Sequence, residues 1–482
     1  MWGNIFFWKI DRLITNVTSL AVGEICHAYV MCFTGLFRDH FVLFEKLAIS
    51  RYNVRRIRYK IIMRPRKEES RRGAAWRQTC FDTSEGMTSK QRIPAYLNLN
   101  RVLLLAIGLW PYQRSKLISL QFVLLFSILL SFILLQLGTL VILRCTTDLV
   151  LKILFIAFFF STCVINYTSF YVNIDAVKSL TQQIQHNYDK LKDEGEIAIM
   201  NKYGNRTKHF TSMCIVLFIC TIYVLLLSQF WPCILDVIQS ANKTRPINSL
   251  RFISEYYIDN QKYLYLIVLY TNAAFFIACL TTLSTGTMLL AYGQYICGML
   301  KIASYRIQYA MRPNVKQPIN LQKKNPIYER IIYAVDIHRK TLQFSESLMS
   351  TFALWFFLLI GAGVISMSLN LIQIFLILSS GYNVVELTIQ VIFLFCQYFY
   401  MFMANYVAQE VADHNNHVFT SIYNIQWYVT PLHVQKMILF MLQRGTKPYH
   451  LQLGSVFVGS LEGFASLMSA SITYFTVIYS IR

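Results

Sequence analysis

The chain has 482 residues, of which 55% are hydrophobic, 15% aromatic and only 14% charged. A soluble domain carries roughly 25% charged residues, so this composition excludes a string of ordinary soluble domains and indicates a membrane protein. The formal net charge of +21 does not indicate nucleic-acid binding, because the basic residues concentrate in residues 1–116 and in loops between apolar segments, as membrane topology requires.

Residues 1–95 are predicted to be an atypical basic N-terminal extension, disordered or spurious. Residues 15–37 are moderately apolar but contain Glu24 and His27, each unfavourable at a bilayer centre. Residues 51–77 form a strongly basic run with little helical periodicity. The alternative interpretation of this run is a cytoplasmic segment attracted to anionic lipid. No secretory signal is recognised at the N-terminus.

Residues 96–116 are predicted to be an amphipathic lead-in, with 98–110 lying along the membrane surface. Seven apolar segments follow, each long enough to cross a bilayer, for which about 20 residues suffice. They are Leu117–Leu143, Leu149–Val172, Met213–Ile238, Tyr263–Ile296, Leu348–Leu378, Val384–Val407 and Leu453–Tyr479. The fourth and fifth exceed one crossing and are expected to extend beyond the bilayer as helix. The fold class is thus an all-α membrane protein, with a six-helix bundle over 117–407, a cytoplasmic segment over 408–452 and a seventh helix over 453–482.

The balance of lysine and arginine predicts the orientation. Loops 173–212, 297–347 and 408–452 carry 18 basic residues, whereas the segments on the opposite side carry 6. The N-terminus is therefore expected in the cytoplasm and the C-terminus outside, the reverse of a G-protein-coupled receptor. The sequon at Asn242 falls in an outer loop and is a predicted glycosylation site. Cys145 and Cys233 both lie near the outer ends of spans, and the sequence does not decide whether they form a disulfide.

The last span carries a polar stripe. Its polar residues recur at steps of 4, 3, 4, 3 and 4, which puts them on one helix face: Glu462, Ser466, Ser469, Thr473, Thr476 and Ser480. Hydrocarbon cannot satisfy these groups, so the face must meet protein or water. Close helix packing and a water-filled path made by several copies of the helix both explain the stripe from spacing alone.

No catalytic constellation is present, so no enzyme activity and no cofactor are expected. The sequence has no Gly-rich phosphate loop and no Ser/His/Asp arrangement. His414 and His417 are one helical turn apart but lack a third ligand, and a polar cytoplasmic helix is the preferred interpretation over a metal site. Eleven cysteines show no metal-binding spacing. Paired intramembrane carboxylates and an internal repeat are missing, which disfavours a transporter.

The outer halves of the spans are rich in aromatic residues and poor in charge. Aromatic walls with a few polar groups are typical of a pocket for a small apolar ligand, although helix packing with an interfacial aromatic belt explains the same pattern. The candidate ligand-binding residues are Phe155, Phe159, Tyr223, Phe230, Trp231, Tyr270, Thr271, Phe393 and Gln397.

From Asn98 onward the chain resembles the insect odorant receptors. The resemblance rests on the C-terminal stretches WY (427–428), QK (435–436), LF (439–440), QRGTKP (443–448), SLEGFA (460–465) and SITYFT (471–476). Further in, GLWP (108–111), EYYID (255–259) and HR (338–339) are similar, and DHNNHV (413–418) resembles hymenopteran members. The chain departs from the family in having Ile425-Gln426 where many members have a cysteine, and in its long N-terminus.

The resemblance implies a ligand-gated, non-selective cation channel at the plasma membrane of olfactory sensory neurons. It implies a heterotetramer with the odorant co-receptor, whose final helices line one pore, with a small apolar odorant bound in the outer half of the bundle. The implied pore-lining residues are Glu462, Ser466, Ser469, Thr473, Thr476, Val477, Ser480 and Ile481, of which Val477 and Ile481 form an apolar gate. The implied intersubunit anchor, with a short helix over 431–444, contains Trp427, Tyr428, Gln435, Lys436, Gln443 and Arg444. A G-protein-coupled chemoreceptor and a gustatory-receptor relative are the alternatives.

Overall fold

The computed structural model describes residues 94–113, 115–142, 146–239, 261–310, 326–380, 384–447, 449–453 and 457–481. Contacts between Cα atoms divide the chain into two units, residues 1–92 with 137–145 and residues 93–136 with 146–482. The helical bundle belongs to the second unit, and of the first only residues 137–142, the end of helix α5, are described. The predictions for the basic N-terminal extension and for Asn242, Cys145 and the Cys233 side chain fall outside the described structure.

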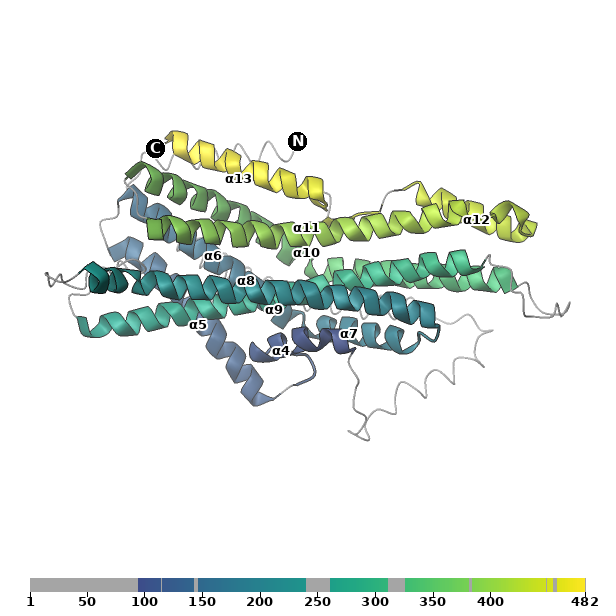
Figure 1. Ribbon diagram of the computed structural model, residues 1–482, viewed down its shortest axis with the longest axis horizontal. Coiled ribbons are helices and arrows are strands. Elements are labelled where there is room, and N and C mark those ends of the chain that lie inside the picture. Colours follow the sequence, from purple (N-terminus) through teal and green to yellow (C-terminus); the bar gives the residue numbers. More distant parts are fainter. Residues whose placement is uncertain are drawn as a thin grey trace, which may run out of the picture. The chain divides into compact units, whose positions relative to one another are not determined.

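Helices make up almost all of the described chain (Figure 1). In chain order the elements are η1 (Ala95–Leu97), α4 (Asn98–Ala106), α5 (Lys116–Ile142), α6 (Thr147–Val172), α7 (Ile174–Asp189), α8 (Glu194–Gln239), α9 (Gln261–Ala310), α10 (Pro326–Ser380), α11 (Val384–Asn424), η3 (Trp427–Val429), α12 (Leu432–Gly445), β1 (Leu451–Leu453), β2 (Phe457–Gly459) and α13 (Leu461–Ile481).

Seven helices in the described ranges are long and apolar enough to cross a membrane, as predicted: α5, α6, α8, α9, α10, α11 and α13. Helices α8, α9, α10 and α11 contain 46, 50, 55 and 41 residues. At about 1.5 Å per residue α10 is about 80 Å long, against about 30 Å for a bilayer core. The expected excess length of the fourth and fifth spans is confirmed, and α8 and α11 are overlong as well.

Most of residues 173–212 are helical, although the hydropathy pattern predicts a loop there. They form α7 and the first part of α8. Helix α7 buries Val177, Leu180, Thr181 and Ile184, spaced at three and four residues on one helix face. Polar residues elsewhere on α7 lower its average hydropathy, which is why a search for apolar segments misses it.

Helices α9, α10 and α11 pack against one another, α8 packs on α9, and α6 and α13 pack on α10. Two glycines on α9 permit the close approach of α11. A Cβ atom at Gly293 would run into Val407, and one at Gly286 would meet the Tyr400 ring. Where lipid surrounds helices, such small residues bring backbones together and packing drives association. The contact holds α11 against α9 along the middle of the bundle.

The lead-in segment packs against protein on one face. Leu104 and Ile107 are fully buried, while Val102 is exposed. The Tyr167 hydroxyl of α6 donates to the Ile107 carbonyl at 2.9 Å. The amphipathic helix expected here is present as α4, and its apolar face lies against the bundle, not only on a membrane surface.

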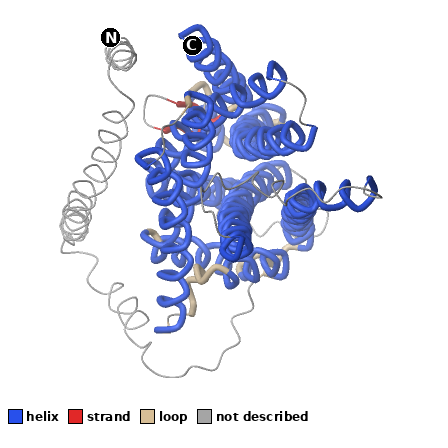
Figure 2. Tube along the Cα trace, turned by 90° about the vertical axis from the view of Figure 1, so that its left-hand side faces the viewer, coloured by secondary structure: helices blue, strands red, loops and turns tan. Residues whose placement is uncertain are grey.

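The last helix begins later than predicted. Residues 451–453 and 457–459 do not belong to it, because they form β1 and β2, which pair antiparallel with Leu451 opposite Gly459, in the only sheet within the described part of the chain (Figure 2). Ser460 then caps α13: its Oγ accepts from the Gly463 backbone N–H at 2.9 Å. The predicted start at Leu453 is therefore wrong. The cap signal at Ser460, followed by Glu462 in the first turn, marks the true boundary.

Candidate ligand site and the last helix

An aromatic cluster joins four helices of the bundle. Its members are Phe132 (α5), Phe155, Phe159 and Phe160 (α6), Phe275 (α9) and Phe393 (α11). The Phe393 ring centroid lies 5.2 Å from that of Phe159, 5.6 Å from Phe275 and 6.0 Å from Phe155. Several of these pairs meet edge to face, the geometry that the ring quadrupole favours. The cluster is thus a wall of rings from residues far apart in sequence.

Aliphatic side chains extend the aromatic cluster toward α8, α10 and α13. Leu225, Leu369, Ile372 and Ile389 are buried with Phe155 and Phe393. The partly buried residues packed against them include Phe475 and Ile478 of α13. The last helix therefore packs against the apolar core that these aliphatic residues form with Phe155 and Phe393.

A few polar atoms accompany this apolar surface. The Tyr270 and Ser131 hydroxyls lie 2.7 Å apart, between α9 and α5. Gln397 Nε2 donates to Ser366 Oγ at 2.8 Å, between α11 and α10, while Gln397 Oε1 is buried with no partner in the described residues. Aromatic walls with a few oriented polar groups form the arrangement expected around a small organic ligand.

The structure brings together only some of the predicted ligand-binding residues. Phe155, Phe159 and Phe393 are in the cluster, and the Tyr270 ring joins it through Phe132 at 6.0 Å. Thr271 is buried, whereas Tyr223 is 61% exposed on an outward face of α8. Phe230 and Trp231 lie in α8, and their side chains are not among those described.

Three ring members of the cluster were missed from sequence: Phe132, Phe160 and Phe275. The run of three phenylalanines at 158–160 and the pair at 275–276 are visible signals for two of them. Adjacent phenylalanines point about 100° apart on a helix, so sequence cannot tell which one turns inward. Contact with a neighbouring helix decides it.

The predicted pore-lining stripe lies on the open face of α13. The residues with exposed side chains include Glu462, Ser466, Ser469, Thr473, Thr476, Val477 and Ser480. Ile481 is in the helix, and its side chain is not described. Only 11% of the most apolar 18-residue stretch of α13 is buried inside the protein. The corresponding stretches of the other six candidate spans in the described chain are 17–33% buried. The stripe is therefore not used to pack α13 within its own chain.

Hydroxyls of the stripe bond within the helix. Ser466 donates to the Glu462 carbonyl at 3.0 Å, Thr473 to Ser469 at 2.9 Å and Ser480 to Thr476 at 2.8 Å. These bonds satisfy the hydroxyl protons while leaving oxygen lone pairs on the open face. Such a face can meet water or another protein surface, and it is poorly suited to hydrocarbon.

The opposite face of α13 is fixed to α10 and α11. The buried Ser368 hydroxyl donates to the Ser471 carbonyl at 3.0 Å. The Tyr479 ring lies 4.6 Å from that of Phe375, and the Phe464 ring 5.6 Å from that of Phe402. Movement of α10 or α11 would therefore be transmitted to the last helix.

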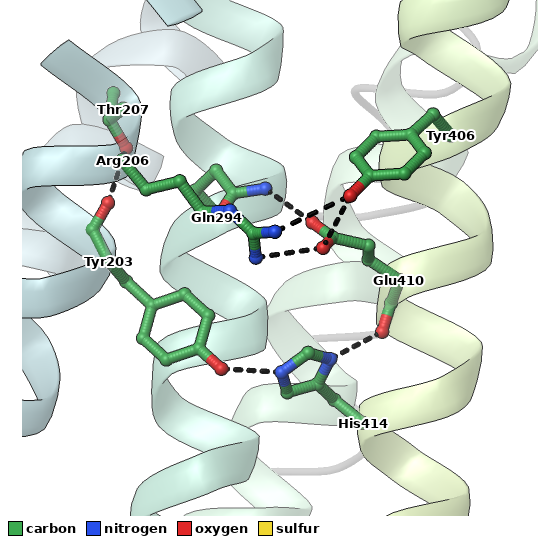
Figure 3. A network of polar contacts seen from close by, with 7 residues as sticks. All are labelled: Tyr203, Arg206, Thr207, Gln294, Tyr406, Glu410 and His414. Atoms are coloured by element: carbon green, nitrogen blue, oxygen red, sulfur yellow. Dashed lines mark hydrogen bonds and ion pairs between the residues drawn. The ribbon is translucent and has the colours of Figure 1, made fainter. Parts of the chain in front are cut away.

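A polar network ties α8, α9 and α11 together farther along the bundle (Figure 3). Glu410 receives Arg206 Nη1 at 2.8 Å, Gln294 Nε2 at 2.8 Å and the Tyr406 hydroxyl at 3.1 Å. One turn on, His414 lies between the Tyr203 hydroxyl and the Glu410 carbonyl. These contacts join three helices around one carboxylate.

The two histidines of the DHNNHV motif have different neighbours. His414 contacts Tyr203, whereas His417 faces Ser304, Ser421 and Lys301. Within the described ranges, no three His, Cys, Asp or Glu side chains are placed to hold a metal ion. The two histidines thus contact α8 and α9 from α11, which is helical at the motif, as the sequence indicated, and continues to Asn424.

The predicted anchor residues lie on an exposed apolar surface after α11. The short helix expected over 431–444 is present as α12. Trp427 and Tyr428 form η3, and Gln435 Nε2 donates to the Tyr428 and Thr430 carbonyls at 2.9 and 2.7 Å. Lys436, Gln443 and Arg444 are exposed. Exposed large apolar side chains surround them: Val429, Leu432, Leu439 and Phe440, the last 73% exposed.

The segment after α12 returns to α10. The Tyr449 hydroxyl donates to Ser345 Oγ at 2.9 Å. Burial raises the pKa of Tyr449 above its usual value, with the hydrogen bond to Ser345 acting in the opposite direction, so the hydroxyl stays protonated as a donor. This contact fixes the chain just before the hairpin that leads into α13.

The fold and site define a polytopic helical membrane protein in which the last span packs against the apolar core that contains Phe155 and Phe393. The sequence profile described as "7tm Odorant receptor" matches residues 146–472. The chain therefore belongs to the insect odorant receptor family, which is not enzymatic. A stretch of 98 residues is 26% identical to "Putative odorant receptor 85d" of Drosophila melanogaster and spans 20% of this chain but only 24% of that relative.

Solved structures of an insect olfactory receptor share this fold. The structure of OR5 from Machilis hrabei in complex with eugenol gives a TM-score of 0.66 at 17% identity, covering 81% of this chain and 99% of that one. A second structure of the same receptor gives a TM-score of 0.64 at 15% identity, covering 80% of this chain and 98% of that one. At these identities the likeness concerns the fold alone.

Proposed function

We propose that this chain is an odorant-receptor subunit that binds a small apolar or volatile ligand at the aromatic cluster and opens a non-selective cation channel. The observation that carries the proposal is the position of α13. Phe475 and Ile478 pack against the apolar core that includes Phe155 and Phe393, while Thr473 and Val477 on the other side of the helix are exposed. One helix thus separates the ligand site from the pore. The OR5 relative solved with eugenol supports a small organic ligand.

Gating follows from contacts that differ between two states. A ligand opens the channel only if it contacts the open arrangement better than the closed one. Occupancy beside the aromatic cluster shifts the ends of α10 and α11, and the Ser368–Ser471 bond carries the shift to α13. Val477 and Ile481 then leave the axis and the pore fills with water, since an apolar ring closes a pore by dewetting.

The proposed orientation places the ligand site toward the outside. The 18 basic residues in one set of loops against 6 in the other support a cytoplasmic N-terminus and an external C-terminus. In this orientation Glu462 lies near the inner vestibule, where it favours cations, and Asn242 is open to glycosylation. The protein then functions in the plasma membrane of olfactory sensory neurons.

Assembly with an odorant co-receptor uses the anchor surface. A monomer rarely exposes so many large apolar side chains together, and Val429, Leu432 and Phe440 are all exposed on η3 and α12. Buried against neighbouring subunits, this surface holds a heterotetramer in which the last helices of the four subunits surround one pore.

The test is a current recording in cells that lack native receptors. With the co-receptor present, an odorant panel should evoke cation current that persists when G-protein signalling is blocked. Current that disappears under the block would support a metabotropic receptor instead. Epitope tags at both termini provide an independent check, because external labelling of the N-terminus would refute the proposed orientation.

A further inference from the structure

Polar residues form a stripe on each of two neighbouring helices beside the aromatic cluster. On α10 they are Ser366, Asn370 and Gln373, at steps of 4 and 3; on α11 they are Glu386, Gln390 and Gln397, at steps of 4 and 7. Each set shares one helix face. Ser366, Asn370, Gln373 and Gln390 are all at least nine-tenths buried. Together with Gln397 they place five amide or hydroxyl groups inside an apolar bundle, and burying such groups is unfavourable unless each finds a hydrogen-bond partner.

Most of this polar set is paired between the helices. Gln397 Nε2 donates to Ser366 Oγ at 2.8 Å. In the amide orientation that gives both its nitrogen and its oxygen a partner, Asn370 donates to Gln390 Oε1 at 3.2 Å. Glu386 is engaged from a third helix, since Lys152 Nζ of α6 lies 3.5 Å from its Oε1.

Gln373 is the exception. It is 5% exposed, and its Nε2 is closed off from solvent with no hydrogen-bond partner in the described residues. It follows Leu369 by four residues and precedes Leu376 by three, and both leucines belong to the apolar surface around Phe155 and Phe393. By helical spacing the Gln373 amide therefore lies on the face that borders the candidate ligand site.

We propose that Gln373 recognises an oxygen atom of the ligand, so that the receptor selects oxygen-bearing volatiles (aldehydes, ketones, esters or alcohols) over hydrocarbons of the same shape. The inference rests on the proposed ligand site. An amide can turn to present N–H or C=O, so it suits either a carbonyl or a hydroxyl. A site built around a buried polar group rejects an analogue that leaves the group unpaired. The aromatic rings supply contact area, and Gln373 supplies the chemical selection.

The experiment compares matched ligand pairs on the full chain co-expressed with its co-receptor. Hexanal, octanal and decanal, and the acetates and alcohols of the same lengths, are each tested against hexane, octane and decane. On the wild type, oxygen-bearing compounds should include the agonists and the alkanes should be weaker. Gln373→Met, of similar length but apolar, should lower the potency of those agonists by about tenfold, as loss of one buried hydrogen bond predicts, and leave alkane responses unchanged or stronger.

Controls separate recognition from folding. Gln183→Met makes the same change on the exposed face of α7, where Gln183 Nε2 reaches only Ser179 Oγ, and should alter nothing. If Gln373→Met does not reach the surface, Gln373→Asn keeps an amide that is too short and should lose the same selectivity. Alkanes as potent as their oxygen-bearing partners, or an equal loss for both classes in Gln373→Met, would overturn the inference while leaving odorant gating intact. Silence toward every compound would instead contradict the proposed function, and the inference with it.

Discussion

Phe393 offers the sharpest test of whether the aromatic cluster binds ligand or only packs helices. It is 6% exposed, and its ring contacts those of Phe155, Phe159 and Phe275. Replacing a buried phenylalanine by alanine costs about 3–5 kcal/mol in well-packed cores. Phe393→Ala should therefore destabilise the protein by about 3 kcal/mol whatever the cluster does.

A second phenylalanine gives the matched control. Phe352 of α10 is fully buried, with the Phe170 ring at 5.2 Å and the Phe356 ring at 5.8 Å. About 25 Å of helix separates it from Leu369 in the cluster. Phe352→Ala should reduce stability about as much as Phe393→Ala, because both remove one buried ring from comparable contacts.

Ligand potency distinguishes the two variants. Loss of an aromatic contact with the ligand is worth about 1 kcal/mol or slightly more, so Phe393→Ala should raise the half-maximal concentration about tenfold. Phe352→Ala should leave it within about twofold. Thermal melting of the purified complex gives the stability change, and dose–response curves normalised to surface expression give potency. Equal potency shifts in both variants would refute a ligand role for the cluster, since potency would then report only stability.

Three further outcomes follow from the described contacts. Val477→Ser should raise ligand-independent current several-fold when co-expressed with the co-receptor, because a polar ring no longer dewets; unchanged basal current would remove Val477 from the gate. Glu410→Gln should lower the stability of the complex by about 1–2 kcal/mol. The loss is smaller than for breaking a fully buried ion pair, because Arg206 is 41% exposed. An unchanged melting temperature would contradict a structural role for the network. Trp427→Ala should reduce surface delivery more than ligand potency, measured by surface biotinylation beside dose–response curves; the reverse ranking would contradict the anchor assignment.

Apolar periodicity was enough to predict seven spans, but it could not give their ends. The start of α13 was misplaced because residues 451–459 are as apolar as the helix that follows. Their pairing as β1 and β2 depends on hydrogen bonds between strands, which hydropathy does not report. Helix α7 was missed for the opposite reason, since its buried stripe is narrow and its mean hydropathy low.

The candidate site was partly predictable, and the limit is geometric. Spacing shows which residues share a helix face, but it does not say which neighbour that face meets. Phe393 and Tyr223 are both aromatic residues of apolar spans, yet one is 6% and the other 61% exposed. Gln373 was overlooked because a lone glutamine in a span resembles any packing residue until the pairing of its neighbours is known.

Glu462 allows the pore assignment of the open α13 face to be tested without touching the gate. Its carboxylate is exposed in the first turn of the helix, where the helix dipole favours negative charge by less than about 1 kcal/mol, so Glu462→Gln should fold normally. In the proposed heterotetramer, the Glu462 carboxylates of the copies of this chain would concentrate cations at the inner mouth of the pore. Glu462→Gln should therefore reduce calcium permeability relative to sodium at low ionic strength. The difference should fade toward about 1 M salt, where the Debye length falls to about 3 Å. Glu346→Gln, an exposed carboxylate on α10 and off the stripe, is the control. Equal permeability in wild type and Glu462→Gln at low salt would mean that the stripe faces protein, and close packing between subunits would then explain its hydroxyls.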